Sequence, residues 1–376
     1  MIFKNLPDIC KIQYGYAFDS SKFSDSEGTP LVRIRDVVRG YSETYTTEEC
    51  DNEYIVQNGD MLIGMDGEFN IARWNGGKAY LNQRVCRLIP TEEVDSMYLY
   101  YFMPKALKSI EEKTPFVTVK HLSAKELNKI MVPTPSISEQ KKISKILQNV
   151  DNLIANRNYQ LSKLDELVKS RFIELFGDPE TNPYGWKQTT VGEVCSSIVR
   201  GPFGSALKKE FFVEPNETTY KVYEQKHAIQ KSATIGTYYI TAEKFDELRR
   251  FECVAGDILM SCSGTMGELY QLPEGCEKGL INQALCKFTL NKKILPIVFL
   301  TYMKQTIGKL ETKGSGIQNI AAVSYVKAMP INLAPMEVQE QFAAFVEQTD
   351  KSKFEIKKSL EKLETLKKAL MQKYFG

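Results

Sequence analysis

Residues 137–177 read ISEQKKISKILQNVDNLIANRNYQLSKLDELVKSRFIELFG. Alternating steps of three and four residues from Leu147 follow a stripe of mostly apolar positions. The stripe continues through Val150, Ile154, Arg157, Leu161, Leu164, Val168, Arg171 and Leu175. A stripe with this spacing, sustained over about four heptads, is typical of a helix that buries one face against another helix. The segment therefore predicts one long helix.

The same pattern returns at the end of the chain. Adding 199 to each stripe position gives a second stripe in the same phase, from Val346 to Tyr374, and the ending Phe176-Gly177 returns as Phe375-Gly376. The chain is therefore interpreted as an internal duplication. Polar residues interrupt both stripes, and we interpret them as setting the register or reaching outward to water. They are Arg157, Arg171, Thr349, Lys353 and Lys367.

The duplication predicts an architecture if the roughly 150 residues between the helices form a compact domain whose ends lie close together. The second helix then begins near the end of the first, so the two apolar stripes can meet only if the helices run antiparallel. We expect two mixed α/β globular units, related by pseudo-twofold symmetry, at opposite ends of a coiled coil. At 1.5 Å per residue, its about 40 residues would span roughly 60 Å.

Short strand-like runs with an occasional helical stretch fill both units, as a mixed α/β or α+β fold requires. We place the first unit at residues 1–136 and the first long helix at 137–177. A polar linker rich in Pro and Gly follows at 178–185, the second unit spans 186–335, and the second helix spans 336–376.

The composition is that of a globular protein, with 43% apolar and 26% charged residues. No run of 18 apolar residues occurs and the N-terminus lacks the regions of a signal peptide, so we expect a cytoplasmic protein. Eight cysteines show no C-x-x-C spacing, and some, such as Cys86, lie in apolar strand-like runs. They are interpreted as reduced core thiols and not as a zinc site.

Charge is distributed unevenly between the two units. Residues 1–136 carry 16 basic against 19 acidic residues, a net charge of −3, whereas residues 186–335 carry 18 against 14, a net charge of +4. Neither unit has the strongly basic character of a domain that binds nucleic acid by itself. This balance counts against DNA binding by the isolated chain.

Catalytic chemistry finds little support. The chain has only two histidines, His121 and His227, and neither lies near a nucleophile motif. Gly76-Gly77-Lys78 lacks the spacing and the hydroxyl of a phosphate-binding loop. Glu224-Gln-Lys226 has no Pro-Asp shortly before it, as a metal-dependent nuclease would require. We therefore expect no catalytic residue and no metal site.

A glycine-bearing loop follows a Gly-Asp pair in each half. Gly59-Asp60 precedes the loop 65–70, and Gly256-Asp257 precedes the loop 261–267. The Gly-Asp pairs themselves are interpreted as turns. Glycine would let the loop backbone approach a ligand closely, and the loop side chains differ between the halves, as recognition residues would. The candidate binding residues are Asp66, Gly67, Asn70, Ser263, Gly264 and Thr265.

A second group of candidates lies in strand-like runs. Arg33 and Arg35 are predicted to project from one face of a strand within residues 30–38, where they suit phosphates or guanine edges. In the second half, Tyr223 and Gln225 share the comparable face, and glutamine can read adenine while the neighbouring Lys226 suits guanine or phosphate. The alternative for both halves is a solvated strand face.

Further pairs of residues recur at a spacing of about 200. Each long helix follows a proline and an early Glu-Gln pair: Pro135 with Glu139-Gln140, and Pro335 with Glu340-Gln341. Each half also has an Asn-Gln pair in a strand-like run: Asn82-Gln83 within a single strand expected at residues 80–89, and Asn282-Gln283 within residues 281–287. Together with the Gly-Asp pairs, these markers span the whole chain, which resembles the specificity subunit of type I restriction-modification systems.

This resemblance implies a non-catalytic reader of double-stranded DNA, in which each globular unit is a target-recognition domain for one half of a bipartite, asymmetric sequence. Members of the family assemble with two modification subunits, which bind S-adenosylmethionine and methylate adenine, and with restriction subunits, which use ATP and Mg²⁺. No cofactor is expected in the chain itself. The repeated helices would act as spacer and docking surface, with Glu139, Gln140, Glu340 and Gln341 as candidate partner contacts.

One alternative stays open, and another is rejected. The chain could be an adaptor that presents two binding domains on a coiled coil to protein or polysaccharide partners, since nothing in its composition excludes this. A self-contained restriction enzyme would need methyltransferase and nuclease domains, for which 376 residues and these motifs are too few.

Overall fold

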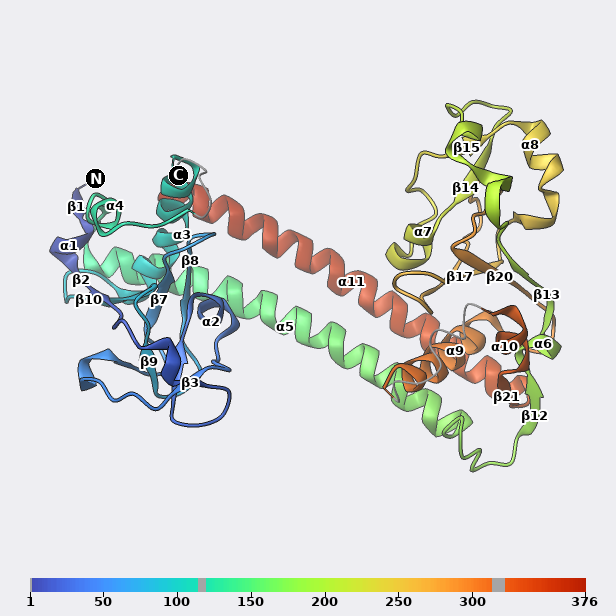
Figure 1. Cartoon of the computed structure of the whole chain (residues 1–376), viewed down its shortest axis with the longest axis horizontal. Coiled ribbons are helices and arrows are strands. Elements are labelled where there is room, and N and C mark those ends of the chain that lie inside the picture. Colours follow the sequence, from blue (N-terminus) through green and yellow to red (C-terminus); the bar gives the residue numbers. More distant parts are fainter. Residues whose placement is uncertain (1, 114–119, 313–321) are drawn as a thin grey trace. The chain divides into compact units, whose positions relative to one another are not determined.

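The computed structural model describes residues 2–113, 120–312 and 322–376. The chain divides into two compact units, which are described separately. Unit 1 comprises Met1–Asn158 and Lys357–Gly376, and unit 2 comprises Tyr159–Ile356. Both units mix helices with small sheets, which confirms the predicted α/β class (Figure 1).

The described residues of unit 1 form three sheets. A two-stranded antiparallel sheet pairs β1 (Phe3–Asn5) with β11 (Met131–Pro133). A four-stranded antiparallel sheet has the order β2-β10-β7-β8, and a five-stranded sheet has the order β3-β5-β4-β9-β6, in which β4 and β9 are parallel. The strands are β2 (Cys10–Tyr14), β3 (Phe23–Ser24), β4 (Thr29–Val32), β5 (Tyr45–Thr46), β6 (Ile55–Val56), β7 (Met61–Gly64), β8 (Asn70–Arg73), β9 (Ala79–Leu81) and β10 (Val85–Pro90).

Unit 2 repeats this plan. β12 (Lys187–Thr190) pairs with β21 (Pro330–Leu333), and two four-stranded sheets have the orders β13-β20-β17-β18 and β15-β14-β19-β16. In the second of these, β14 and β19 are parallel, as β4 and β9 are in unit 1. The strands are β13 (Cys195–Arg200), β14 (Tyr220–Tyr223), β15 (Tyr239–Ile240), β16 (Glu252–Cys253), β17 (Ile258–Ser261), β18 (Leu269–Gln271), β19 (Gly279–Ile281) and β20 (Leu285–Leu290).

Helices complete both units. In unit 1, α3 (Ser96–Lys113) contributes Tyr98, Leu99 and Met103 to the main core cluster, and α9 (Pro296–Thr312) does the same in unit 2 with Phe299 and Met303. The short helices are α1 (Leu6–Ile9), α2 (Ile34–Arg39), α4 (Ala124–Asn128), α6 (Val191–Val194), α7 (Gln225–Gln230), α8 (Ala242–Glu247) and α10 (Val323–Ala328). The 3₁₀ turns are η1 (Ser20–Lys22), η2 (Asn52–Tyr54), η3 (Gly204–Leu207), η4 (Lys209–Phe211) and η5 (Arg249–Phe251).

The two repeated segments form single helices, α5 (Ile137–Phe176) and α11 (Met336–Phe375), each drawn as one continuous ribbon in Figure 1. Every position of both predicted stripes is buried or half-buried, so the heptad prediction is confirmed. In unit 1, Leu147 shares a core cluster with Met371 and Phe375, and one turn later Asp151 forms an ion pair of 2.7 Å with Lys367. Because later positions of α5 meet earlier positions of α11, the helices run antiparallel there, as predicted.

The corresponding part of unit 2 has the same arrangement. Phe172 and Phe176 pack their rings against Phe342, and Asp165 forms an ion pair of 2.7 Å with Lys353. Both lysines that interrupt the second stripe therefore pair with a carboxylate on the neighbouring helix, in agreement with their interpretation as register residues.

Two predicted strands were wrong in their extent. The strand expected within residues 30–38 ends at Val32, and Ile34–Arg39 form α2 instead. The single strand expected at residues 80–89 is interrupted at residues 82–84, and its two parts, β9 and β10, belong to different sheets. The first break places Arg33 and Arg35 at the start of a helix, and the second places Gln83 and Arg84 in a turn; these two segments form part of the candidate site.

The cysteines are free thiols, as predicted, and six of the eight are buried. Burial raises the pKa of Cys10, Cys86 and Cys195 to about 12, so these side chains are protonated and behave as small apolar groups. Among the described residues, no helix is both long and apolar enough to cross a membrane.

Candidate functional site

Three loops meet in each unit. In unit 1, we call residues 33–36 at the start of α2 the helix loop, residues 65–70 after β7 the glycine loop, and residues 82–84 between β9 and β10 the Asn-Gln loop. The same three loops of unit 2 are residues 224–227, 262–268 and 282–284.

Backbone hydrogen bonds hold the three loops of unit 1 together. The Asn82 N–H donates to Val32 O (3.3 Å), which joins the Asn-Gln loop to the strand that precedes the helix loop. The Met65 N–H donates to Arg84 O (3.0 Å), which joins the glycine loop to the Asn-Gln loop. Side chains on the three loops are therefore presented next to one another.

Unit 2 uses the same two bonds. The Asn282 N–H donates to Tyr223 O (3.0 Å), and the Cys262 N–H donates to Ala284 O (2.8 Å). The backbone framework of the site is thus common to both units, although the side chains that it carries differ.

A glycine in each unit makes this framework possible, and sequence reasoning missed both. A Cβ on Gly15 would lie 2.0 Å from Asn82 O, and a Cβ on Gly201 would lie 1.9 Å from Asn282 O. Both glycines lie where a strand ends against the Asn-Gln loop. The N–H of each donates to the carbonyl of the first residue of the neighbouring strand in the sheet, which is β10 in unit 1 and β20 in unit 2. The signal in the sequence was a glycine in a matching place of each half.

The helix loop of unit 1 carries two exposed arginines, but not on a strand face as predicted. Arg33 is the N-cap of α2 and Arg35 lies in its first turn, because Asp36 accepts a hydrogen bond (2.9 Å) from the Arg33 N–H and so closes that turn. Arg35 donates to Thr44 Oγ1 (3.1 Å). Both arginines line a pocket of about 410 Å³ together with Asn82, Gln83 and Arg84 of the Asn-Gln loop.

Arg84 links this pocket to the glycine loop. Its Nε lies 3.6 Å from Asp66 Oδ2, and Asp66 Oδ1 lies 2.5 Å from His121 Nδ1. Gly67 has a φ of +77°, and its N–H donates to Lys120 O (2.9 Å). Asp66 is therefore held in a charge network, whereas Gly67 is exposed. Asn70 begins β8 and donates to Glu68 O (3.1 Å), so it shapes the loop.

In unit 2 the prediction for Tyr223 was wrong. Its side chain is 0% exposed, and its hydroxyl donates to Glu277 O (2.6 Å), so it cannot reach a ligand outside. The cause is an error of one position in the match between halves. The cap residue Glu224 corresponds to Arg33, and Lys226 therefore corresponds to Arg35, whereas Tyr223 corresponds to the buried Val32.

The other unit 2 candidates are brought together. Gln225 accepts a hydrogen bond from Ser263 Oγ (3.0 Å) and donates to Ser263 O, which ties the helix loop to the glycine loop. Lys226 lies 2.6 Å from Glu224. Gly264 lies beside Gln225, and both Gly264 and Thr265 are exposed. A position that sequence reasoning did not list, Gln283, is exposed in the Asn-Gln loop, as Gln83 is in unit 1.

The helix loops are closed by different residues. His227 Nδ1 accepts from the Glu224 N–H (2.8 Å), and its Nε2 donates to Ile235 O (2.7 Å), which requires a neutral ring. Burial lowers the pKa of His227, in agreement with this neutral state. In unit 1, burial raises the pKa of Asp36, although the neighbouring charges of Arg35 and Arg39 oppose the change.

The Gly-Asp pairs have the structural role that was predicted. Asp60 accepts from the Gln57 N–H (2.9 Å) and from Arg87 (3.0 Å). Asp257 accepts from the Val254 N–H (3.0 Å), and its carboxylate lies 3.4 Å from Lys287. Each pair therefore lies in a turn, and its aspartate is anchored to a basic residue of the neighbouring strand in the sheet.

The candidate partner contacts divide into two kinds. Glu139, Glu340 and Gln341 are exposed, and each lies within the first two turns of its long helix. Gln140 is only 1% exposed, and its amide accepts from the Asp95 N–H (2.9 Å) and donates to Pro135 O (2.9 Å), so its prediction as a surface contact was wrong. Its counterpart is Gln339 and not Gln341, since Gln339 accepts from the Leu295 N–H (2.9 Å) and donates to Ala334 O (3.0 Å).

No cluster of three or more His, Cys, Asp or Glu side chains is placed to hold a metal ion within the described part of the chain. The fold and the site together define a duplicated protein with two binding units of one framework.

Comparison with known proteins agrees with this class. A family model described as the type I restriction modification DNA specificity domain matches residues 2–166 and 183–368. The chain belongs to this family.

Two curated relatives show the extent of the similarity. The type I restriction enzyme EcoBI specificity subunit of Escherichia coli is 35% identical over 165 residues, which is 43% of this chain and 34% of that protein. A putative type I restriction enzyme MjaX specificity subunit of Methanocaldococcus jannaschii is 25% identical over 397 residues, which is 98% of this chain and 91% of that protein. The match to the EcoBI subunit thus spans about a third of its length, whereas the other match is nearly complete.

Solved structures share the fold. The S subunit of a type I restriction-modification system from M. genitalium superposes with a TM-score of 0.55 at 15% identity, and the match covers 100% of this chain and 96% of that one. A chain from a structural study of complex assembly in a type I system gives a TM-score of 0.59 at 15% identity, with 100% and 97% coverage.

Proposed function

We propose that this chain is the DNA sequence-recognition subunit of a type I restriction-modification complex, and that each unit reads one half of a bipartite, asymmetric target. One observation carries the proposal. Both units bring the same three loops together through the same backbone bonds, while the side chains on the loops differ. A common framework with different contacts is what reading two unrelated half-sites requires.

The side chains suggest which bases each unit prefers. In unit 1, Arg33, Arg35 and Arg84 surround one pocket, and the arginine fork suits the O6 and N7 acceptors of guanine or a phosphate. In unit 2, the corresponding positions of Arg35 and Arg84 are Lys226 and Ala284, and Gln225 and Gln283 supply amides suited to adenine. We therefore expect Arg35 and Arg84 to select a guanine in the half-site of unit 1. The matching residues of unit 2 should select a different base in the other half-site.

Membership of the family supports a proposal about the partners. We propose two modification subunits, which supply S-adenosylmethionine, and restriction subunits, which use ATP and Mg²⁺, with assembly in the cytoplasm. Glu139, Glu340 and Gln341 are the exposed helix-start residues proposed to contact the modification subunits. The small net charges of the units fit this assembly, because bound partners would supply the phosphate contacts that drive DNA affinity.

Substitution of Arg84 tests the assignment. In the assembled complex, Arg84→Ala should weaken binding to the specific target by about 1–3 kcal/mol, as expected for the loss of one bidentate base contact. The loss should disappear on targets that already carry a different base at one position of the unit 1 half-site. Competition binding to a set of single-base target variants measures both effects.

Arg39→Ala is the control, since Arg39 is an exposed arginine of the same unit, on α2, that pairs with Glu43 (2.5 Å) and does not line the pocket. Equal losses for both variants on every DNA sequence would mean that Arg84 contributes only general charge.

Exchange of residues 1–136 for those of another member of the family should change one half-site, and a change in both would reject the assignment of one unit to one half.

The charge argument predicts the behaviour of the isolated chain. We expect feeble specific binding by the chain alone and tight binding by the complex, compared in titrations at two salt concentrations. Tight, sequence-specific binding by the isolated chain would contradict this expectation.

A further inference from the structure

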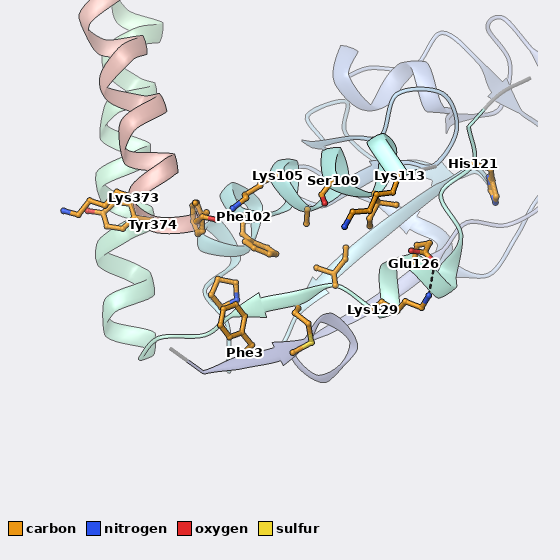
Figure 2. A pocket seen from close by; sticks show the side chains of 17 residues that line it. Phe3, Phe102, Lys105, Ser109, Lys113, His121, Glu126, Lys129, Lys373 and Tyr374 are labelled. Carbon is orange, nitrogen blue, oxygen red and sulfur yellow. Dashed lines mark hydrogen bonds and ion pairs between the residues drawn. The ribbon is translucent and has the colours of Figure 1, made fainter. Parts of the chain in front are cut away.

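Unit 1 contains a groove of about 800 Å³ besides the pocket that its arginines line, and His121, which contacts Asp66 of the glycine loop, is part of its lining. It lies between α3, the β1–β11 sheet and the end of α11 (Figure 2). Its floor includes large apolar side chains that are unusually open, since Phe3 is 52% exposed and Met131 is 47% exposed. Four lysines line it: Lys105, Lys113, Lys129 and Lys373.

The matching place in unit 2 is occupied by the chain itself. Residues that follow α5 run across β21, where Asn332 Nδ2 donates to Pro179 O (2.8 Å). The Tyr184 hydroxyl then returns to α5 and donates to Glu174 O (2.8 Å). Pro183 packs closely on Gly177: a Cβ added to Gly177 would lie only 2.5 Å from the ring of Pro183.

The internal repeat matches the residues of unit 2 that make these contacts with residues of unit 1 that line the groove. The Leu6 N–H donates to Ile130 O (2.9 Å) in unit 1, and the Val191 N–H donates to Met329 O (2.9 Å) in unit 2, so an offset of 199 relates β11 to β21. The same offset relates α11 to α5. Asn332, Glu174 and Gly177 all contact the extended segment, and their counterparts Pro133, Lys373 and Gly376 all line the groove of unit 1.

The two places differ in charge. Lys373 corresponds to Glu174, and Lys129 corresponds to Ala328. Asp95 and Leu295 make the same hydrogen bond in the two units, to Gln140 and to Gln339, so an offset of 200 relates the residues near α3 to those near α9. By this offset, Lys105 corresponds to Gln305. The groove of unit 1 therefore carries a lysine at three positions where unit 2 has glutamate, alanine and glutamine, and the counterpart of Lys113 lies outside the described residues.

The charged groups of the groove are partly engaged. Lys129 pairs with Glu126 (3.1 Å), the carboxylate that lines the groove, and Lys105 donates to the Phe375 carbonyl. Figure 2 shows Lys105 and Lys113 on α3, opposite Phe3 of β1. The lysines thus surround an apolar floor, and an occupant needs both carboxylates and apolar side chains.

We propose that this groove binds an extended, acidic segment of a partner protein, at the place that residues 178–184 occupy in unit 2. The segment Asp-Pro-Glu-Thr-Asn-Pro-Tyr at 178–184 is a suitable test sequence, since it carries two carboxylates for the lysines, two prolines, and one aromatic ring for the apolar floor. DNA would satisfy the lysines but would leave the rings and thioether of the floor in water. A peptide covers both.

A synthetic peptide tests the proposal directly. A fluorescein-labelled peptide of sequence DPETNPYG, which is residues 178–185, is titrated with the full chain and followed by fluorescence anisotropy. We expect saturable binding that weakens with salt, and about tenfold weaker binding for the neutral analogue NPQTNPYG because its carboxylates are lost.

Substitutions on the chain locate the binding. Lys373→Glu gives this position the residue of its unit 2 counterpart, and it should weaken peptide binding about tenfold through like-charge repulsion. Lys163→Glu, on the exposed face of α5, is the control and should leave the affinity unchanged. Lys373→Gln removes the charge without reversing it and should give an intermediate affinity, and circular dichroism checks that each variant is folded.

Three outcomes would overturn the proposal. The first is the absence of saturable binding at millimolar peptide, and the second is binding that is insensitive to both Lys373 variants. The third is a loss of DNA binding by the assembled complex of Lys373→Glu without any peptide binding, which would assign the lysines to DNA. Since peptide binding and half-site selection are measured separately, each can fail without the other.

Discussion

The residue that closes the first turn after β4 is Asp36, and the residue at the same place after β14 is His227. Both accept the N–H of the cap residue three positions earlier, so the backbone turns in the same way. The cap residues, Arg33 and Glu224, then present opposite charges at the same place. Unit 1 and unit 2 therefore differ in chemistry at positions where they agree in geometry, which means that the framework is set by backbone bonds and buried groups.

The largest test of this comparison concerns the glycines that both frameworks need. Gly201→Ala and Gly15→Ala should each destabilise their unit by about 3 kcal/mol, since the added Cβ meets a backbone oxygen that cannot move without breaking the Asn-Gln loop. Chemical denaturation with hydrogen exchange resolved to each unit measures the effect.

Gly275→Ala is the control in unit 2. Its φ is +76° but a Cβ there meets open space, so only the strain of the left-handed backbone, about 1–2 kcal/mol, is expected. If Gly15→Ala and Gly201→Ala cost no more than this, the close approach of the two loops is not a shared requirement.

The second test concerns the two buried glutamines. Gln140→Ala and Gln339→Ala should each cost about 1–3 kcal/mol, because the N–H of Asp95 or Leu295 loses its acceptor. Gln341→Ala should change the free energy of unfolding by less than about 0.5 kcal/mol, as expected for an exposed side chain. A larger cost for Gln341 than for Gln339 would restore the original match of Gln140 with Gln341.

These glutamines also show what the sequence can predict. The heptad stripe, the duplication and the Gly-Asp turns follow from local spacing, and the structure bears them out. The role of Gln140 does not follow, because a Glu-Gln pair at a helix start reads as polar surface until the Asp95 N–H is known to lie above it. That contact spans 45 residues and depends on tertiary structure.

The candidate site was predictable in part for the same reason. The glycine loops were found because glycine marks them in the sequence. Arg84 was missed because its run reads as one strand, and the break between β9 and β10 exists only because the two parts join different sheets. Tyr223 was misassigned since an offset of 190 places it opposite Arg33, whereas the observed caps give an offset of 191.

The third prediction uses pH to separate the two helix loops. The pKa of His227 is lowered from 6.5, so the unfolded state binds a proton more readily, and the stability that the neutral ring contributes is lost as pH falls from about 6.5 through the folded value. The pKa of Asp36 is raised from 3.8, so its protonated form is favoured in the folded state. That contribution is fully present below 3.8 and is lost as pH rises through the folded value.

Acidification should therefore loosen the helix loop of unit 2 before that of unit 1. Hydrogen exchange of the Glu224 and Arg33 amides between about pH 7 and pH 5.5, corrected for intrinsic rates, compares the two. A faster loss of protection at Arg33 would contradict the assignment. His227→Asp, which gives unit 2 the residue of unit 1, should remove the acid sensitivity at Glu224.

The smallest expected effect separates the two ion pairs between the long helices. Lys367 pairs with Asp151, which also accepts from the Tyr101 hydroxyl (2.7 Å), whereas Lys353 pairs with the exposed Asp165 and lies 3.7 Å from Asp350. Double-mutant cycles with Lys→Gln and Asp→Asn should give coupling energies of about 0.2–1 kcal/mol for each pair at low salt. Asp165 is 64% exposed and Asp151 is 34% exposed, so added salt should screen the unit 2 pair more strongly. If the two coupling energies depend equally on salt, the Tyr101 hydrogen bond does not protect the Asp151–Lys367 ion pair from screening. The ion pairs of the two units are then equivalent in their salt dependence.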